Sequence, residues 1–223
     1  MKRTRMISDG KTETSRHIAK DGYVKIKISV ILPVHNAEKE LISLVNDCFE
    51  TTGDIQADCE IVIIDDASTD ASGEIAENLS LEFPQIKVIS QWDALGTEKS
   101  ILNGLRLAEG SLLYIYYLMS GYMFPQITLY YEAMPFTDVV LGRFLGPTEN
   151  YVGMAMLKSQ TLPVLGNAVA NPEEAVLLMN RNNVRYLELR YEARGNRNAP
   201  SAHEATIKPG KSRRASKSVV PAF

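Results

Sequence analysis

Two apolar runs decide the fold: KISVILPVHN at residues 27–36 and EIVIIDDASTD at residues 60–70. Each is a short stretch rich in Ile and Val with no helical period, and each stops abruptly at polar residues. This pattern is typical of strands that are buried on both faces of a parallel sheet. We therefore expect both runs to form central strands.

The segment between the two runs predicts a crossover helix. From Glu38 to Phe49, apolar residues recur at steps of three and four, which gives one apolar helical face. Such a helix returns the chain to the same edge of the sheet, so the unit is βαβ. In open α/β sheets, ligands bind beyond the carboxyl ends of the strands, where residues 33–36 and the adjacent carboxylates of Asp65 and Asp66 fall.

The alternation of strands and helices continues to residue 118. The polar residues after Asp66 offer N-cap oxygens for a helix that ends at Phe83. A strand is expected at 86–90, a helix at 98–109 and a strand at 112–118. This order predicts an α/β fold with a mostly parallel sheet and helices on both faces.

The composition narrows the class of protein. The chain has 223 residues, 45% apolar and 23% charged, which fits one sizeable core. The net charge of -3 gives no general attraction to nucleic acid, so we expect no nucleic-acid partner. Cys48 and Cys59 lack metal-ligand spacing, and free thiols in a reducing compartment are favoured over a disulfide.

The ends of the chain differ from its middle. Residues 1–22 are polar and aperiodic, which predicts a mobile tail, and residues 195–223 predict a basic, disordered C-terminal tail. Neither a secretory signal nor an apolar run near the ~20 residues of a membrane span is present, so a cytoplasmic location is expected. The basic tail would allow peripheral contact with the inner face of an anionic membrane; the alternative is a solubilising tail.

The motifs resemble those of family 2 glycosyltransferases. That family's GT-A fold opens with a strand ending in Pro-Val/Tyr-Tyr-Asn-Glu and a second ending in Asp-Asp-Gly/Ala-Ser-Thr-Asp. The matching stretches here are PVHNAE at 33–38 and DDASTD at 65–70, and GLRLAEG at 104–110 resembles the motif before the fourth strand. Residues 138–144 and 173–194 are similar to the later strand and the closing helix-strand-Arg unit of polyprenyl-phosphate sugar synthases, such as those of the dolichol-phosphate mannose type.

The resemblance implies a GT-A domain over residues 23–194 that binds a nucleoside-diphosphate sugar of the UDP or GDP type. A uracil-type base would donate its imide N–H to the carboxylate of Asp66, with Asp65 as a neighbour or a helix cap. The alternative roles of the site residues, without a ligand, are turns at the ends of strands, helix caps and solvated cations at the surface. The implied nucleotide-sugar site consists of Pro33, Val34, Asn36, Asp65, Asp66, Lys99 and Arg194.

The resemblance also implies Mg²⁺ or Mn²⁺, but the ligands are missing. The family's Asp-x-Asp falls here on Tyr117, Leu118 and Met119. A phenol and a thioether replace carboxylates poorly around a hard cation, so we assign no metal ligand. Cations such as Arg143 and Arg190 would have to neutralise the phosphates instead.

Two functions follow from the resemblance. The first is transfer of a sugar from a nucleoside-diphosphate sugar to a lipid-phosphate or glycan acceptor. The alternative is a catalytically silent nucleotide-sugar-binding or scaffold protein on the same fold, because the metal-binding carboxylates are missing. Residues 144–172 contain Gly146-Pro147 and Leu162-Pro163, which predict little continuous helix for an acceptor site, and no catalytic residue is assigned.

Overall fold

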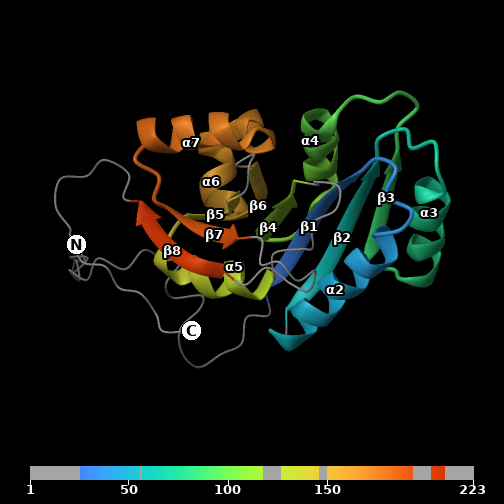
Figure 1. Ribbon diagram of the computed structural model, residues 1–223, viewed down its shortest axis with the longest axis horizontal. Helices are drawn as coiled ribbons and strands as arrows, with labels where there is room; N and C mark the ends of the chain where they lie inside the picture. Colours follow the sequence, from blue (N-terminus) through green and yellow to red (C-terminus); the bar gives the residue numbers. More distant parts are fainter. Residues whose placement is uncertain (1–25, 56, 118–126, 146–149, 193–201, 209–223) are drawn as a thin grey trace, which may run out of the picture.

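The computed structural model describes residues 26–55, 57–117, 127–145, 150–192 and 202–208. Its strands are β1 (Lys27–Val34), β2 (Asp58–Asp65), β3 (Ile86–Ser90), β4 (Leu112–Tyr116), β5 (Val139–Leu145), β6 (Asn150–Leu157), β7 (Tyr186–Glu192) and β8 (Ala202–Lys208). They form one sheet in the order β3-β2-β1-β4-β6-β5-β7-β8 (Figure 1). β6 runs antiparallel to its neighbours β4 and β5, and β8 runs antiparallel to β7, whereas the other strand pairs are parallel.

Helices cover both faces of this sheet, as expected (Figure 1). One face packs against α2 (Leu41–Asp54), α3 (Ser72–Glu82) and α5 (Ile127–Ala133). The other packs against α4 (Thr97–Leu107), α6 (Lys158–Leu165) and α7 (Pro172–Arg181). Short 3-10 turns, η1 (Met134–Phe136) and η2 (Gly166–Ala170), lead into β5 and α7.

The parallel half of the sheet confirms the βαβ prediction. β1 and β2 are buried along most of their length and pair in register from Lys27 with Asp58 to Val34 with Asp65. The crossover helix begins at Leu41, later than the expected Glu38. The cause is a tight turn, because the amides of residues 40 and 41 both donate to the carbonyl of Ala37.

The segment between Phe144 and Pro172 departs from the prediction. It was expected to hold little continuous helix, yet it forms the eight-residue α6, which contains Pro163, and the strand β6, which was not predicted. Met154, Ala155 and Met156 give a weak local strand signal because they are not β-branched. The backbone groups of β4 and β5 on either side of β6 satisfy its hydrogen bonds, so the sheet itself makes this segment a strand.

A further difference lies within the segment expected to be a C-terminal tail. Residues 202–208 form β8, which pairs with β7 from Tyr186 to Tyr191. The open edge of β7 offers backbone donors and acceptors that the composition of residues 202–208 does not reveal. The sheet therefore extends beyond residue 194, the predicted end of the domain. The expected N-terminal tail at residues 1–22 lies outside the described residues.

The strand directions define two edges of the sheet. We call the edge where β1, β2, β3, β4, β5 and β7 end, and where β6 begins, the carboxyl edge, and the opposite one the amino edge. Cys48 and Cys59 are free thiols, as predicted. Across the described ranges, no helix combines the length and apolarity that crossing a bilayer requires.

Candidate functional site

The loops that follow β1 and β2 are tied together at the carboxyl edge. The backbone amide of Asn36 donates to Ser68 Oγ at 3.0 Å, and its side-chain Oδ1 accepts from the amide of Thr69 at 2.8 Å. Asn36 and Ala67 both have φ near 52°, a left-handed conformation in which non-glycine residues are uncommon. The two loops therefore form a single, tightly constrained unit.

A second set of hydrogen bonds extends this unit toward α3. The amide of Ala37 donates to Ser72 Oγ at 2.7 Å, and the amide of Glu38 donates to Asp70 Oδ2 at 3.1 Å. Asp70 also accepts from the Ser72 amide at 2.9 Å, so its carboxylate satisfies the start of α3. Burial opposes the charged form of Asp70, but these hydrogen bonds outweigh it and lower its pKa.

His35 is exposed, yet its ring is held on both sides. Its Nδ1 lies 2.7 Å from the carbonyl oxygen of Asp66, and its Nε2 lies 3.2 Å from the side-chain nitrogen of Asn36. Because a carbonyl only accepts, Nδ1 carries the proton, and Nε2 accepts from the side-chain amide group of Asn36. The orientation of the imidazole is thus fixed at the rim of the site.

The adjacent carboxylates point to different partners. Asp66 accepts from the backbone amides of Leu95 and Gly96, at 2.7 and 2.8 Å, and only 6% of it is exposed. Asp65 accepts from the amide of Ser68 at 3.2 Å. Neither carboxylate therefore caps α3. Asp66 instead organises the loop before α4.

Pro33 and Val34 complete the part of the predicted site that lies in β1. Both are buried within the sheet, and the carbonyl of Val34 accepts from the amide of Asp66 at 2.8 Å. Lys99 is exposed in the first turn of α4, which begins at the carboxyl edge. The structure thus brings the predicted residues of β1, β2 and α4 to one edge, whereas Arg194 lies outside the described residues.

A cluster of charged residues lies farther along the same edge, on the ends of β5 and β7. Glu188 is almost fully buried, and its Oε1 lies 3.2 Å from Arg190 Nε and 3.9 Å from Arg143 Nη1. The arginine side chains keep 28% and 30% of their surface exposed. The guanidinium carbon of Arg143 also lies 5.5 Å from the centre of the Tyr151 ring, over its face. A buried acid and an aromatic ring therefore fix two guanidinium groups at the surface.

The position expected for the metal motif does not fit a metal. Tyr117 is buried, and its hydroxyl donates to the carbonyl of Val169 at 2.6 Å. Burial, together with the charge of Glu173, raises the pKa of this hydroxyl far above its usual range. Leu118 and Met119 lie outside the described residues, and across the described ranges no three His, Cys, Asp or Glu side chains could hold a metal ion.

The structure adds an acid that sequence reasoning did not assign to the site. Glu173 is exposed in the first turn of α7, and its charge helps to raise the pKa of Tyr117 and of Tyr151. Asn171 caps this helix and also donates to Glu98 at the start of α4 at 2.8 Å. The helix-start signature Asn-Pro-Glu-Glu was readable in the sequence, but the hydrogen bond from Asn171 to Glu98 was not.

The amino edge carries a different kind of cluster. Glu60 is 2% exposed, lies 3.1 Å from the ammonium groups of both Lys27 and Lys87, and accepts from the hydroxyl of Ser29. Each lysine also contacts Glu109 at 2.7 Å. Burial opposes the charge of Glu60, but hydrogen bonds from Ser29, from the Glu109 amide and from the lysines lower its pKa to about 2.

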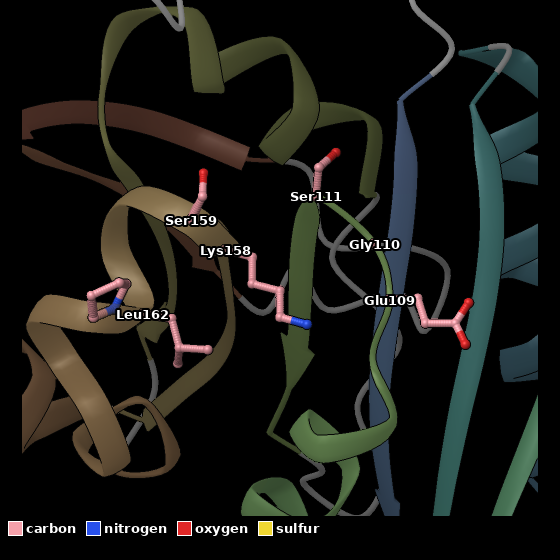
Figure 2. A pocket seen from close by; sticks show the side chains of 7 residues that line it. Glu109, Gly110, Ser111, Lys158, Ser159 and Leu162 are labelled. Atoms are coloured by element: carbon pink, nitrogen blue, oxygen red, sulfur yellow. The ribbon is translucent and has the colours of Figure 1, made fainter.

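An open hollow of about 610 Å³ lies beside this cluster (Figure 2). It lies between the turn before β4 and the start of α6, where Lys158 Nζ donates to the carbonyl of Ala108 at 2.5 Å. The hollow is thus on the opposite edge of the sheet from Asp65 and Asp66. Its lining residues are Glu109, Gly110, Ser111, Lys158, Ser159, Leu162 and Pro163.

Comparisons with known proteins identify a family that part of the chain resembles. Residues 29–118 match the model of the family described as glycosyl transferase family 2. The glycosyltransferase GlyG of Streptococcus pneumoniae is 31% identical over 88 residues, which are 40% of this chain and 28% of that protein. The dolichol-phosphate mannosyltransferase of Pyrococcus furiosus is 30% identical over 93 residues, which are 40% of this chain and 25% of that protein.

A solved structure extends the likeness to most of the sheet. Residues 1–349 of TarS from S. aureus, in complex with UDP, superpose with a TM-score of 0.52 at 19% identity. The match covers 75% of this chain and 61% of that one. This confirms the predicted GT-A fold. The chain spans only about a quarter of the length of the two curated relatives named above.

Proposed function

We propose, from the match of residues 29–118 to the model of glycosyl transferase family 2, that the chain binds a nucleoside-diphosphate sugar at its carboxyl edge and transfers the sugar to an acceptor. The observation that carries the proposal is the Asp65-Asp66 pair, which lies at the end of β2 and is tied to the loop after β1. Ligands of α/β sheets bind at this place. The UDP complex of TarS supports a nucleotide of this class.

The base of the nucleotide would lie against the ends of β1 and β2. Each carboxylate oxygen of Asp66 accepts one backbone amide and retains a second lone pair, which can accept the imide N–H of a uracil-type base. The fixed ring of His35 and the turn at Asn36 would bound the base on the β1 side. Asp65 would support the loop rather than contact the base.

The diphosphate must be bound without the family's metal motif. Lys99 on α4 and the exposed parts of Arg143 and Arg190 provide positive charge along the same edge, and Arg194 would add to it. An arginine fork matches two phosphate oxygens at once, so it suits a diphosphate leaving group. Glu188 would hold the guanidinium groups of Arg143 and Arg190 in place.

Transfer to a hydroxyl acceptor needs one base. The acceptor oxygen attacks the anomeric carbon, the bond from that carbon to the diphosphate oxygen breaks, and the acceptor proton moves to a carboxylate. Direct attack from the face opposite the leaving group inverts the configuration. Glu173 is the described acid that best fits this role, because it is exposed at the start of α7, where Asn171 donates to Glu98 at the start of α4 on the carboxyl edge.

The acceptor we propose is a lipid phosphate or a glycan. The dolichol-phosphate mannosyltransferase among the relatives supports the first. A phosphate oxygen needs no base at neutral pH, whereas a glycan hydroxyl does. Glu173→Gln should therefore abolish transfer to a glycan acceptor but reduce transfer to a lipid phosphate only slightly.

The experiment that tests the proposal is calorimetric titration with UDP and GDP, each with Mn²⁺ and with a chelator. We expect one nucleotide to bind with similar affinity in both conditions, because cations replace the metal. Failure of both nucleotides to bind would overturn the proposal. Binding that requires Mn²⁺ would refute the metal-free diphosphate site while leaving nucleotide binding intact.

Arg194 is tested separately. Arg194→Ala should weaken the binding of UDP or GDP about tenfold and leave the affinity for the nucleoside unchanged, because only the diphosphate would contact the guanidinium. Arg181→Ala serves as the matched control, because it removes a different cation, one that lies in the last turn of α7. This change should alter neither affinity. Equal affinities of wild type and Arg194→Ala for the diphosphate would exclude Arg194 from the site.

A further inference from the structure

The loop between β3 and α4 is fixed at both ends to the Asp65-Asp66 pair. At its start, the amide of Gln91 donates to the carbonyl of Asp65 at 2.9 Å. At its end, the amides of Leu95 and Gly96 donate to the carboxylate of Asp66. Both ends of the loop are therefore fixed beside the Asp65-Asp66 pair, and the exposed residues 92–94 lie between them in the chain.

The tip carries Trp92, the only tryptophan of the chain. Its side chain is 99% exposed, more than any other large hydrophobic side chain in the described residues. By contrast, Tyr114, Tyr116 and Tyr130 are at most 2% exposed. An indole normally buries a large apolar area, so a fully exposed one on a fixed loop is a marked exception to the packing of this fold.

We propose, on the basis of the proposed function, that Trp92 is the stacking surface for the base of the bound nucleotide. A heteroaromatic base has a flat π face and a polar edge. The loop and the end of β2 match both parts of the base. The indole of Trp92 can stack on its π face, and the carboxylate of Asp66 can accept a hydrogen bond from its polar edge. Recognition of the base would thus combine one stacked and one hydrogen-bonded contact on a single unit.

The neighbouring residues favour a base over a lipid surface. Asp93 follows Trp92 directly, and Glu98 lies in the first turn of α4; both are exposed. These acids oppose approach to an anionic bilayer, which attracts basic segments. A sugar ring could also stack on the indole and donate a hydroxyl to Asp66, so the test below includes an oligosaccharide.

Fluorescence of the single tryptophan gives a direct test. Titration with UDP, GDP and uridine should change the Trp92 emission in a saturable way, with the midpoint that calorimetry gives for the same compound. Maltoheptaose and vesicles of phosphatidylglycerol should leave the emission unchanged. A response to vesicles or to the oligosaccharide, with none to nucleotides, would overturn the inference.

Variants of the loop provide the second arm. Trp92→Ala should weaken uridine and UDP binding about tenfold, whereas Trp92→Phe should restore most of the affinity because it keeps an aromatic face. Leu81→Ala removes another exposed apolar side chain, on α3, and should change nothing. Wild-type affinity in Trp92→Ala would refute the stacking role and leave the proposed function standing, whereas absence of nucleotide binding in the wild type would remove both.

Discussion

The two edges of the sheet use charged residues in opposite ways. At the amino edge, Glu60 and Glu109 pair with Lys27 and Lys87, so two acids and two bases neutralise one another. At the carboxyl edge, Asp65 and Asp66 accept instead from backbone amides, and the adjoining loops and the start of α4 carry exposed side chains such as His35, Lys99 and Trp92.

This difference indicates that the charged residues of the amino edge stabilise the fold, whereas those of the carboxyl edge are available to bind a ligand. Removal of one partner from a buried ion pair destabilises the fold, and a carboxylate in such a pair has little left to offer a ligand. A carboxylate held by backbone amides keeps its charge and its remaining lone pairs, and its surroundings do not cancel that charge. Mutations at the amino edge should therefore affect unfolding first, whereas mutations at the carboxyl edge should affect nucleotide binding first.

The largest expected effect is on Glu60. Glu60→Gln leaves Lys27 and Lys87 facing a neutral group. Because these lysine side chains are 39% and 32% exposed, we expect a loss at the lower end of the ~3 to 5 kcal/mol that breaking a buried ion pair costs. Urea denaturation measures this loss. Glu109→Gln is the matched control, because that side chain is 64% exposed and the change should cost less than about 1 kcal/mol. Equal losses in the two variants would contradict the contrast between buried and exposed acids.

The same carboxylate should make the protein sensitive to acid. The pKa of Glu60 is about 2 in the folded chain against a reference of 4.5, so its stabilisation is complete above pH 4.5 and disappears as the pH falls toward 2. The expected loss is on the order of 3 kcal/mol. Urea midpoints of the wild type and of Glu60→Gln at pH 6 and pH 2.5 test this. The gap between the two proteins should narrow at low pH, and a constant gap would refute the assignment.

At the carboxyl edge, the largest effect should come from Asp66. Asp66→Asn removes the charge that would bind the base, and loss of a charged hydrogen bond should weaken nucleotide binding about ten- to a hundredfold. Asp65→Asn should weaken it less, because that side chain supports a turn. Calorimetry with UDP or GDP compares the two variants. Small and equal effects would remove Asp66 from the base site.

The smallest effect concerns Tyr117. Tyr117→Phe removes the hydrogen bond to the carbonyl of Val169 and should lower the unfolding free energy by about 1 kcal/mol. Nucleotide affinity measured with Mn²⁺ and with a chelator should be unchanged, because the hydroxyl is buried in the core and is not a metal ligand. A loss of affinity only in the presence of Mn²⁺ would contradict this position.

Local pattern was enough to predict the parallel half of the sheet. The apolar runs of β1 and β2 and the helical period of α2 are short-range signals, and they place Asp65 and Asp66 at the carboxyl edge without reference to the rest of the chain. No short-range signal of this kind predicted the strands β6 and β8, which form by pairing with strands from other parts of the chain. β6 is a strand because β4 and β5 surround it, and β8 because β7 leaves an open edge.

The same division holds for the candidate site. The sequence by itself determined which acids end β2 and that the expected metal motif is replaced at Tyr117, because both follow from residue identity and spacing. Only the tertiary structure decided that Asp66 holds the Trp92 loop, that Glu188 joins Arg143 and Arg190, and that Asn171 at the start of α7 bonds Glu98 at the start of α4. These contacts form only when separate elements pack together, so no local stretch of sequence encodes them.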